Sequence, residues 1–169
     1  HQRVRRQRQM CIRDSNIGVG IGEIIDEFGK SLFDEIDYEQ EGKNALKFAD
    51  LFKNNPNVFI PKLEKDFSSK RVITTSWIDG VKLRDREILE QNNLIPSSYI
   101  RTCVISGLQQ LFEYGYFHAD PHPGNMFALK GGTLDNGHLA YVDFGMMDTI
   151  TNSDRLTLIK AIVHLINQE

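Results

Sequence analysis

The feature that most limits what this chain can fold into is a polar loop followed closely by Asp-Phe-Gly. Residues 117–125 read FHADPHPGN and residues 143–145 read DFG, with 18 positions from Asn125 to Asp143. Between the two segments, an Asp-Asn-Gly turn precedes a short run of alternating apolar residues, which predicts a β-hairpin. A candidate fold therefore has to accommodate a loop, a hairpin and Asp-Phe-Gly in close succession.

The loop is compatible with several kinds of site. A zinc site would require His118, Asp120 and His122 to converge, and ligands at alternate positions need an extended strand. Pro121 and Pro123 remove two backbone donors from such a strand, which disfavours zinc. Covalent hydrolysis is also disfavoured, because the sequence shows neither a nucleophile elbow nor an exposed cysteine partner.

Phosphoryl transfer fits the loop better. It needs an aspartate near the accepting hydroxyl, and an asparagine and a second aspartate that hold Mg²⁺. Asp120, Asn125 and Asp143 supply these groups, and the intervening Pro-His-Pro-Gly turn is stiff enough to fix their distances. We expect Gly145 to let the chain turn sharply after Asp143. The combination indicates the C-lobe of a protein-kinase-like fold.

The rest of the chain predicts mixed helices and strands, hence an α+β fold. Apolar residues at steps of three and four predict helices over 22–53, 97–117 and 152–168, and NNPNVFIP breaks the first of them. Residues 71–83 are rich in β-branched side chains and contain an Asp-Gly turn, which predicts a strand that ends near Trp77.

The helix over 97–117 has the clearest pattern. We expect Ser97 or Ser98 to cap it, and we expect its apolar face to pack in the core, with Cys103 as a packing residue. That face comprises Ile100, Cys103, Val104, Gly107, Leu108, Leu111 and Phe112. The helices over 97–117 and 152–168 are expected to offer their apolar faces to one another.

Charge and hydropathy exclude some functions. The net charge is −3, yet residues 1–15 hold five arginines against one aspartate. This tail lacks aromatic residues, so we expect no nucleic-acid partner. Because MCIRDS resembles translated adapter sequence, we treat residues 1–15 as non-native or disordered. No apolar run approaches the length of a membrane span, so we expect a cytoplasmic protein, with peripheral association at a membrane still open.

Three segments together closely resemble the UbiB family of atypical kinases: YFHADPHPGNMF, LAYVDFGMM and LFDEIDYEQEGKNALKF. That family is implicated in ubiquinone and other isoprenoid-quinone metabolism. The resemblance covers residues 16–169 and looks nearest to cyanobacterial and plastid members. It implies ATP and Mg²⁺ as cofactors, and lipids or proteins of quinone pathways as further partners.

The resemblance also implies roles for individual residues. It makes Asp120 the catalytic aspartate, and Asn125 and Asp143 the metal-binding residues. Glu41 matches the helix-C glutamate that pairs with a nucleotide-binding lysine. Glu35 and Asp37 match a family-specific cluster by the nucleotide, and TTSWIDG matches the hinge beside adenine, which implies nucleotide contacts for Ser76, Trp77 and Ile78.

The elements that the family places before helix C are not in this sequence, so we expect a fragment that is truncated at both ends. Residues 16–80 would be the rest of the N-lobe with the hinge, and residues 81–169 the front of a mainly helical C-lobe. The function implied is an ATP-dependent atypical kinase or ATPase, and these residues alone are expected to be inactive. The interval between Asp-Phe-Gly and the helix over 152–168 leaves no room for a peptide platform, which disfavours protein substrates. Two alternatives remain: a small-molecule kinase of the aminoglycoside or choline type, and a nucleotide-binding pseudokinase scaffold.

Overall fold

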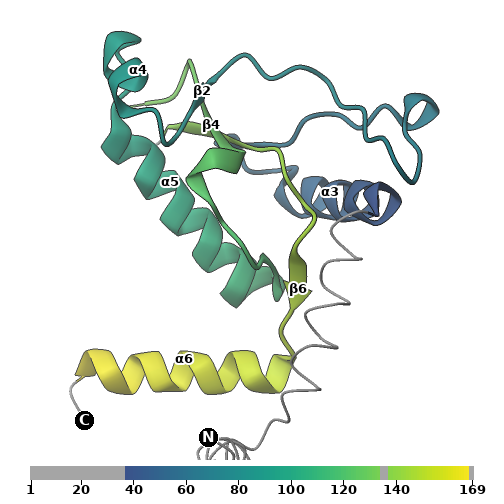
Figure 1. Cartoon of the computed structure of the whole chain (residues 1–169). Helices are drawn as coiled ribbons and strands as arrows, with labels where there is room; N and C mark the ends of the chain where they lie inside the picture. Colours follow the sequence, from purple (N-terminus) through teal and green to yellow (C-terminus); the bar gives the residue numbers. More distant parts are fainter. Residues whose placement is uncertain (1–36, 134–136, 168–169) are drawn as a thin grey trace, which may run out of the picture. The chain divides into compact units, whose positions relative to one another are not determined.

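The computed structural model describes residues 37–133 and 137–167, which form an α+β fold (Figure 1). Glu35 and residues 1–15 lie outside the described residues. The helical elements are α3 (Tyr38–Phe52), η1 (Lys65–Phe67), α4 (Arg86–Gln91), α5 (Pro96–Leu108), η2 (Gln109–Tyr114), η3 (Pro123–Asn125) and α6 (Asn152–Asn167). The strands are β1 (Val58–Phe59), β2 (Val81–Lys82), β3 (Tyr116–His118), β4 (Met126–Leu129), β5 (His138–Tyr141) and β6 (Met147–Thr149).

Two small sheets carry the polar loop and Asp-Phe-Gly. The larger sheet has the order β1-β5-β4-β2, in which β4 and β5 form the predicted antiparallel hairpin and β1 runs parallel to β5. The smaller sheet pairs β3 with β6 in antiparallel fashion. The polar loop links β3 to β4, and Asp-Phe-Gly lies between β5 and β6. Because both flanking pairs are hydrogen-bonded, the two segments are held side by side.

Helix α3 supplies much of the core. Its Asp37 cap accepts the backbone N–H groups of Glu39 and Gln40, which satisfies donors that the first turn leaves unpaired. The helix ends at Phe52, before the predicted break at NNPNVFIP. Its buried face joins side chains from the sheets and from Asp-Phe-Gly in one cluster, which includes Ala45, Phe48, Phe52, Val58, Tyr116, Met126, Leu139, Tyr141 and Phe144.

The predicted packing face of the helix over 97–117 is wrong. Ile100, Val104 and Leu108 are exposed, whereas the buried side of α5 carries Ser98, Tyr99, Thr102 and Ser106, followed in η2 by Gln110. These polar side chains are buried because they satisfy polar groups around them. The Thr102 hydroxyl, for example, donates to the carbonyl of Gly137 over 2.8 Å. Cys103 does pack against the core, as expected, and burial raises the pKa of its thiol.

The ends of that helix also differ from the prediction. It begins at Pro96, and the Ser98 hydroxyl donates to the Ile95 carbonyl rather than capping a backbone N–H. The last turn is a π-helix that Gly115 ends with a φ of 64°, a left-handed conformation that glycine adopts at little cost. The chain then becomes strand β3 instead of continuing as a helix to residue 117.

The strand predicted to end near Trp77 is not formed. Residues 72 and 75 make only isolated bridges, Ser69 with Val72 and Leu63 with Thr75, and the next true strand is β2. Residues 62–64 run beside residues 74–76, where the N–H of Glu64 donates to the Thr74 carbonyl and the N–H of Ser76 to the Lys62 carbonyl, but this pairing is too short to form a strand. Trp77, which follows this short pairing, is 91% exposed.

Helix α6 confirms the helix predicted over 152–168, but its apolar side chains are not covered. Leu156, Val163 and Ile166 are exposed, and α6 buries none of its residues. It contacts η2, where the Arg155 guanidinium donates to the Glu113 carbonyl. The expected contact between its apolar face and that of α5 is therefore not made. In the described part of the chain, no helix has the length and apolar character needed to cross a membrane.

Candidate functional site

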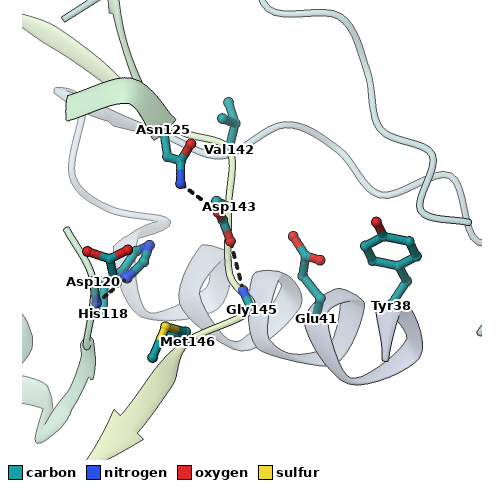
Figure 2. A pocket seen from close by; sticks show the side chains of 9 residues that line it. All are labelled: Tyr38, Glu41, His118, Asp120, Asn125, Val142, Asp143, Gly145 and Met146. Atoms are coloured by element: carbon teal, nitrogen blue, oxygen red, sulfur yellow. Dashed lines mark hydrogen bonds between the residues drawn. The ribbon is translucent and has the colours of Figure 1, made fainter. Parts of the chain in front are cut away.

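A cavity of about 500 Å³ lies where the polar loop, Asp-Phe-Gly and α3 meet (Figure 2). It unites four of the residues singled out from the sequence, namely Glu41, Asp120, Asn125 and Asp143. The complete lining is Tyr38, Glu41, His118, Asp120, Asn125, Val142, Asp143, Gly145 and Met146. Its volume falls within the range typical of small-molecule sites.

Asn125 and Asp143 are directly bonded. The Asn125 side-chain amide donates to Asp143 Oδ2 over 2.6 Å, and the backbone N–H of Val142 donates to the Asn125 carbonyl over 3.2 Å. Asp143 Oδ1 accepts the N–H of Gly145 at 3.0 Å. The two residues predicted to hold a metal therefore lie side by side, on segments fixed by paired strands.

This donor set suits Mg²⁺, which prefers carboxylate and amide oxygens and usually keeps further oxygen ligands from water or phosphate. In residues 37–133 and 137–167, no group of three or more His, Cys, Asp or Glu side chains is placed to hold a metal ion. A cation at Asn125 and Asp143 would thus complete its shell with oxygens from a bound molecule.

The structure does not support the conformational role predicted for Gly145. It has no positive φ, and a Cβ there would lie 3.5 Å from Asp143 Oδ1, which is an ordinary contact. The change of direction after Asp143 is instead stabilised by the hydrogen bond from the Gly145 N–H to the Asp143 carboxylate.

His118 joins the polar loop to Asp-Phe-Gly. Its Nδ1 accepts the backbone N–H of Asp120 at 3.2 Å, and both His118 and Asp143 line the cavity. Burial lowers the pKa of His118, although the nearby Asp143 and Asp120 carboxylates act in the opposite direction. The bond from Asp120 anchors the backbone of that residue to His118, while the Asp120 side chain remains exposed at the cavity.

His122 stiffens the loop and does not line the cavity. Its Nδ1 accepts the N–H of Gly124 at 3.0 Å. A Cβ at position 124 would lie 2.8 Å from that nitrogen, so the close approach requires glycine. The Nδ1 atoms of His118 and His122 are both occupied by backbone donors.

Glu41 reaches the site from α3. Its Oε1 accepts the N–H of Phe144 at 3.4 Å, and one turn further on Asn44 donates to the Phe144 carbonyl at 2.9 Å. Burial raises the pKa of Glu41, the bond from Phe144 opposes that shift, and the charge of Asp143 adds to it. None of the ion pairs among the described residues involves Glu41.

The other predicted nucleotide contacts are not at the cavity. Asp37 caps α3, with Lys70 Nζ 3.8 Å from its carboxylate. Ser76 bonds the backbone of Lys62 through both its N–H and its hydroxyl. Trp77 and Ile78 are likewise absent from the lining, and Glu35 is outside the described residues.

Sequence reasoning missed two residues that support the site. Asn44 lies three positions after Glu41, so helical spacing alone could have placed it on the same face. Gln110 bonds the backbone of His118 from the buried side of η2, and nothing in its sequence context distinguishes it from a solvated glutamine.

Comparison with known proteins adds to this geometry. The profile of the ABC1 atypical kinase-like domain matches residues 7–169. An uncharacterized protein of Synechocystis sp. is 48% identical over 154 residues, which cover 91% of this chain and 26% of that protein. The Arabidopsis thaliana protein named ACTIVITY OF BC1 COMPLEX KINASE 1, chloroplastic, is 38% identical, with 86% of this chain and 21% of that protein covered.

Two further similarities extend the comparison. A Histophilus somni protein named probable protein kinase UbiB is 32% identical, with 87% of this chain and 27% of that protein covered. The structure of the Rv3197–erythromycin complex from Mycobacterium tuberculosis matches with a TM-score of 0.55 and 25% identity, over 81% of this chain and 33% of that one. The chain thus spans about a quarter of the length of the curated relatives that it matches.

Proposed function

Since the chain belongs to the ABC1/UbiB family of atypical kinases, we propose that it forms the metal and acceptor side of a Mg-ATP site. The enzyme would be a phosphotransferase or ATPase that supports isoprenoid-quinone lipid metabolism. The observation that carries the proposal is the convergence of Asp120, Asn125 and Asp143 in one cavity.

Each of these residues has a separate role in the proposal. Asn125 and Asp143 hold the metal through their side-chain oxygens, on segments that the strand pairs keep in register. Asp120 has its backbone anchored by His118 and its carboxylate free, so it orients the attacking hydroxyl or water and accepts its proton. Bound Mg²⁺ would neutralise charge on the phosphate oxygens.

Glu41 supports the nucleotide part of the proposal. A half-buried carboxylate with a raised pKa, and without an ion pair among the described residues, gains from an added cation. We propose that this cation is the nucleotide-binding lysine that the family pairs with the helix-C glutamate. Contacts of Glu35, Asp37, Ser76, Trp77 and Ile78 with the nucleotide belong to the same proposal.

The short interval between Asp-Phe-Gly and α6 supports a small or lipid-linked acceptor. Residues 147–149 of that interval pair with β3 as strand β6, and α6 begins at Asn152. A segment this short, and already paired, has little chain left over for a peptide-binding platform. The name of the Histophilus relative reads probable protein kinase, which names protein as the acceptor of that relative, whereas the name of the Arabidopsis relative contains only the word kinase.

Calorimetry of ATP binding tests the metal assignment. In the full-length protein, Asp143→Asn should weaken Mg²⁺-dependent ATP binding by about tenfold or more, since even groups that only orient metal ligands contribute this much. Asp148→Asn is the matched control, because Asp148 is exposed on β6 and does not line the cavity. Unchanged Mg²⁺-dependent ATP binding in Asp143→Asn would show that the aspartate of this Asp-Phe-Gly does not bind the metal.

A further inference from the structure

We propose that Gln110 is a positioning residue for Asp120, acting through the backbone of His118. The proposal rests on the function proposed above, in which Asp120 faces the phosphoryl acceptor. Gln110 lies in the π-helical turn η2 and is only 4% exposed, so it cannot touch the acceptor itself. Single π-helical turns are rare and often occur near functional sites.

Two hydrogen bonds connect Gln110 to the loop. Gln110 Oε1 accepts the backbone N–H of His118 at 2.9 Å, and His118 Nδ1 accepts the backbone N–H of Asp120 at 3.2 Å. The side chain of Gln110 therefore controls the point at which β3 ends and the polar loop begins.

The topology explains why this N–H needs a side-chain acceptor. Among the described residues, strand β3 pairs only with β6, and the next residue, Ala119, already donates its N–H to the Met146 carbonyl on that side. In the part of the chain that the structure describes, no strand lies along the opposite edge of β3. At His118, the Gln110 side chain supplies the acceptor that a neighbouring strand would otherwise provide. Without it, the buried N–H of His118 would lack a hydrogen-bond partner, which would lower the free energy of unfolding.

Buried polar groups beside Gln110 set the orientation of its amide. The Ser106 hydroxyl donates to the Cys103 carbonyl at 3.1 Å, which leaves its oxygen to accept from the Tyr141 hydroxyl 2.8 Å away. The Tyr141 oxygen then faces the Gln110 amide, whose NH₂ acts to lower the pKa of the Tyr141 hydroxyl against the larger, opposite effect of burial. The amide NH₂ thus points to Tyr141, and Oε1 is left for His118.

The network is rigid because its members are buried and mutually satisfied. Ser106 and Gln110 are four residues apart and so share the face of α5 and η2 that meets β5. Tyr141 closes the contact from β5, two residues before Asp143. Fully satisfied buried networks of this kind hold one arrangement. We propose that the network of Ser106, Gln110 and Tyr141 thereby fixes the spacing between Asp120 and Asp143.

The test compares Gln110→Met with Gln109→Met in the full-length protein. Methionine is close to glutamine in length, but its thioether accepts the His118 N–H far more weakly than an amide oxygen does. Gln109 lies in the same turn and bonds Asn55 rather than the loop, so it controls for general damage to η2. Three quantities are measured: ATP turnover, the dissociation constant of Mg-ATP, and amide hydrogen exchange of the peptide that contains His118.

Gln110→Met should lower turnover by about tenfold to a hundredfold, which is the effect of small misplacements of reacting groups. Nucleotide affinity should stay within about twofold, because Asn125 and Asp143 are held by other contacts, and exchange at His118 should be faster. Tyr141→Phe, which frees the amide but keeps Oε1, should give a smaller loss of turnover. In the double variant the two losses should not add, since both act through one network.

The proposal is overturned if turnover or exchange at His118 is unchanged, if affinity falls as much as turnover, or if Gln109→Met has the same effect. Asp120→Asn separates this proposal from the function on which it rests. If Asp120→Asn leaves turnover intact while Gln110→Met still speeds exchange at His118, the hydrogen bond is confirmed. The same result would refute the catalytic role proposed for Asp120, and therefore also the positioning role proposed for Gln110.

Discussion

Removal of the Phe48 ring should destabilise the chain strongly. Phe48 is fully buried in α3, and its ring centroid lies 4.7 Å from that of Phe52 and 5.3 Å from those of Tyr141 and Phe144. Replacement of such a ring by alanine leaves a cavity and costs about 3–5 kcal/mol. With a urea m-value of about 2 kcal/mol/M, a loss of about 4 kcal/mol lowers the unfolding midpoint by about 2 M.

The assay for Phe48→Ala is urea unfolding followed by far-ultraviolet circular dichroism. Trp77, the single tryptophan, is so exposed that its fluorescence would report unfolding poorly. Leu46→Ala is the control on the same helix, since Leu46 is 41% exposed and its loss should move the midpoint by about 0.5 M or less. Equal midpoints for the two variants would refute the view that α3 is held by its aromatic contacts with Tyr141 and Phe144.

Two further predictions concern titratable groups at the site. Burial raises the pKa of Glu41 above its ordinary value of 4.5, so folding favours the protonated carboxyl. The contribution of this carboxyl to the free energy of unfolding is therefore fully present below pH 4.5 and is lost as the pH rises through the folded-state pKa. Glu41→Gln keeps an acceptor for Phe144 and should resist urea better than the wild type at pH 7, with a difference that closes below pH 4.5; a difference independent of pH would contradict this. Zinc titrated into the protein should not bind stoichiometrically at His118 and His122, since both Nδ1 atoms accept backbone N–H groups. Stoichiometric binding that the double variant His118→Ala, His122→Ala abolishes would restore the zinc interpretation.

The approach of Asn125 to Asp143 was predictable because its signals are local, whereas the place of Glu41 was implied only by the family resemblance. The turn between Asn125 and Asp143 specifies a hairpin by its own residues, and the hairpin brings the two ends together whatever surrounds it. The helix ending near residue 53 was marked by asparagine and proline in the same way. The role of each residue toward ATP and Mg²⁺ remains a prediction.

The packing of α5 was not predictable by the same means. Periodicity identifies the apolar face of a helix, and that face usually packs in the core. Here Ser98, Thr102, Ser106 and Gln110 are buried, because each meets a specific polar group on the helix, the sheet or the loop. Such partners depend on tertiary structure, which no pattern within residues 96–114 encodes. The strand predicted before Trp77 fails for a related reason, since β-branched residues form a strand only as far as a neighbouring segment pairs with them, and here that pairing is confined to residues 62–64.

The parallel pairing of β1 with β5 has a consequence for the order of folding. Val58 pairs with Leu139, whereas Leu129 pairs with His138 within the hairpin. Each doubling of a closed loop costs about 0.6 kcal/mol of chain entropy, so lengthening a loop from about 10 to about 80 residues adds about 2 kcal/mol. Contacts of high sequence separation also slow folding. The β4–β5 hairpin can therefore form early, and the pairing of β1 with β5 is expected later. Because α3 precedes β1 in the chain and packs beside it, we expect Glu41 to reach the cavity after the hairpin has formed.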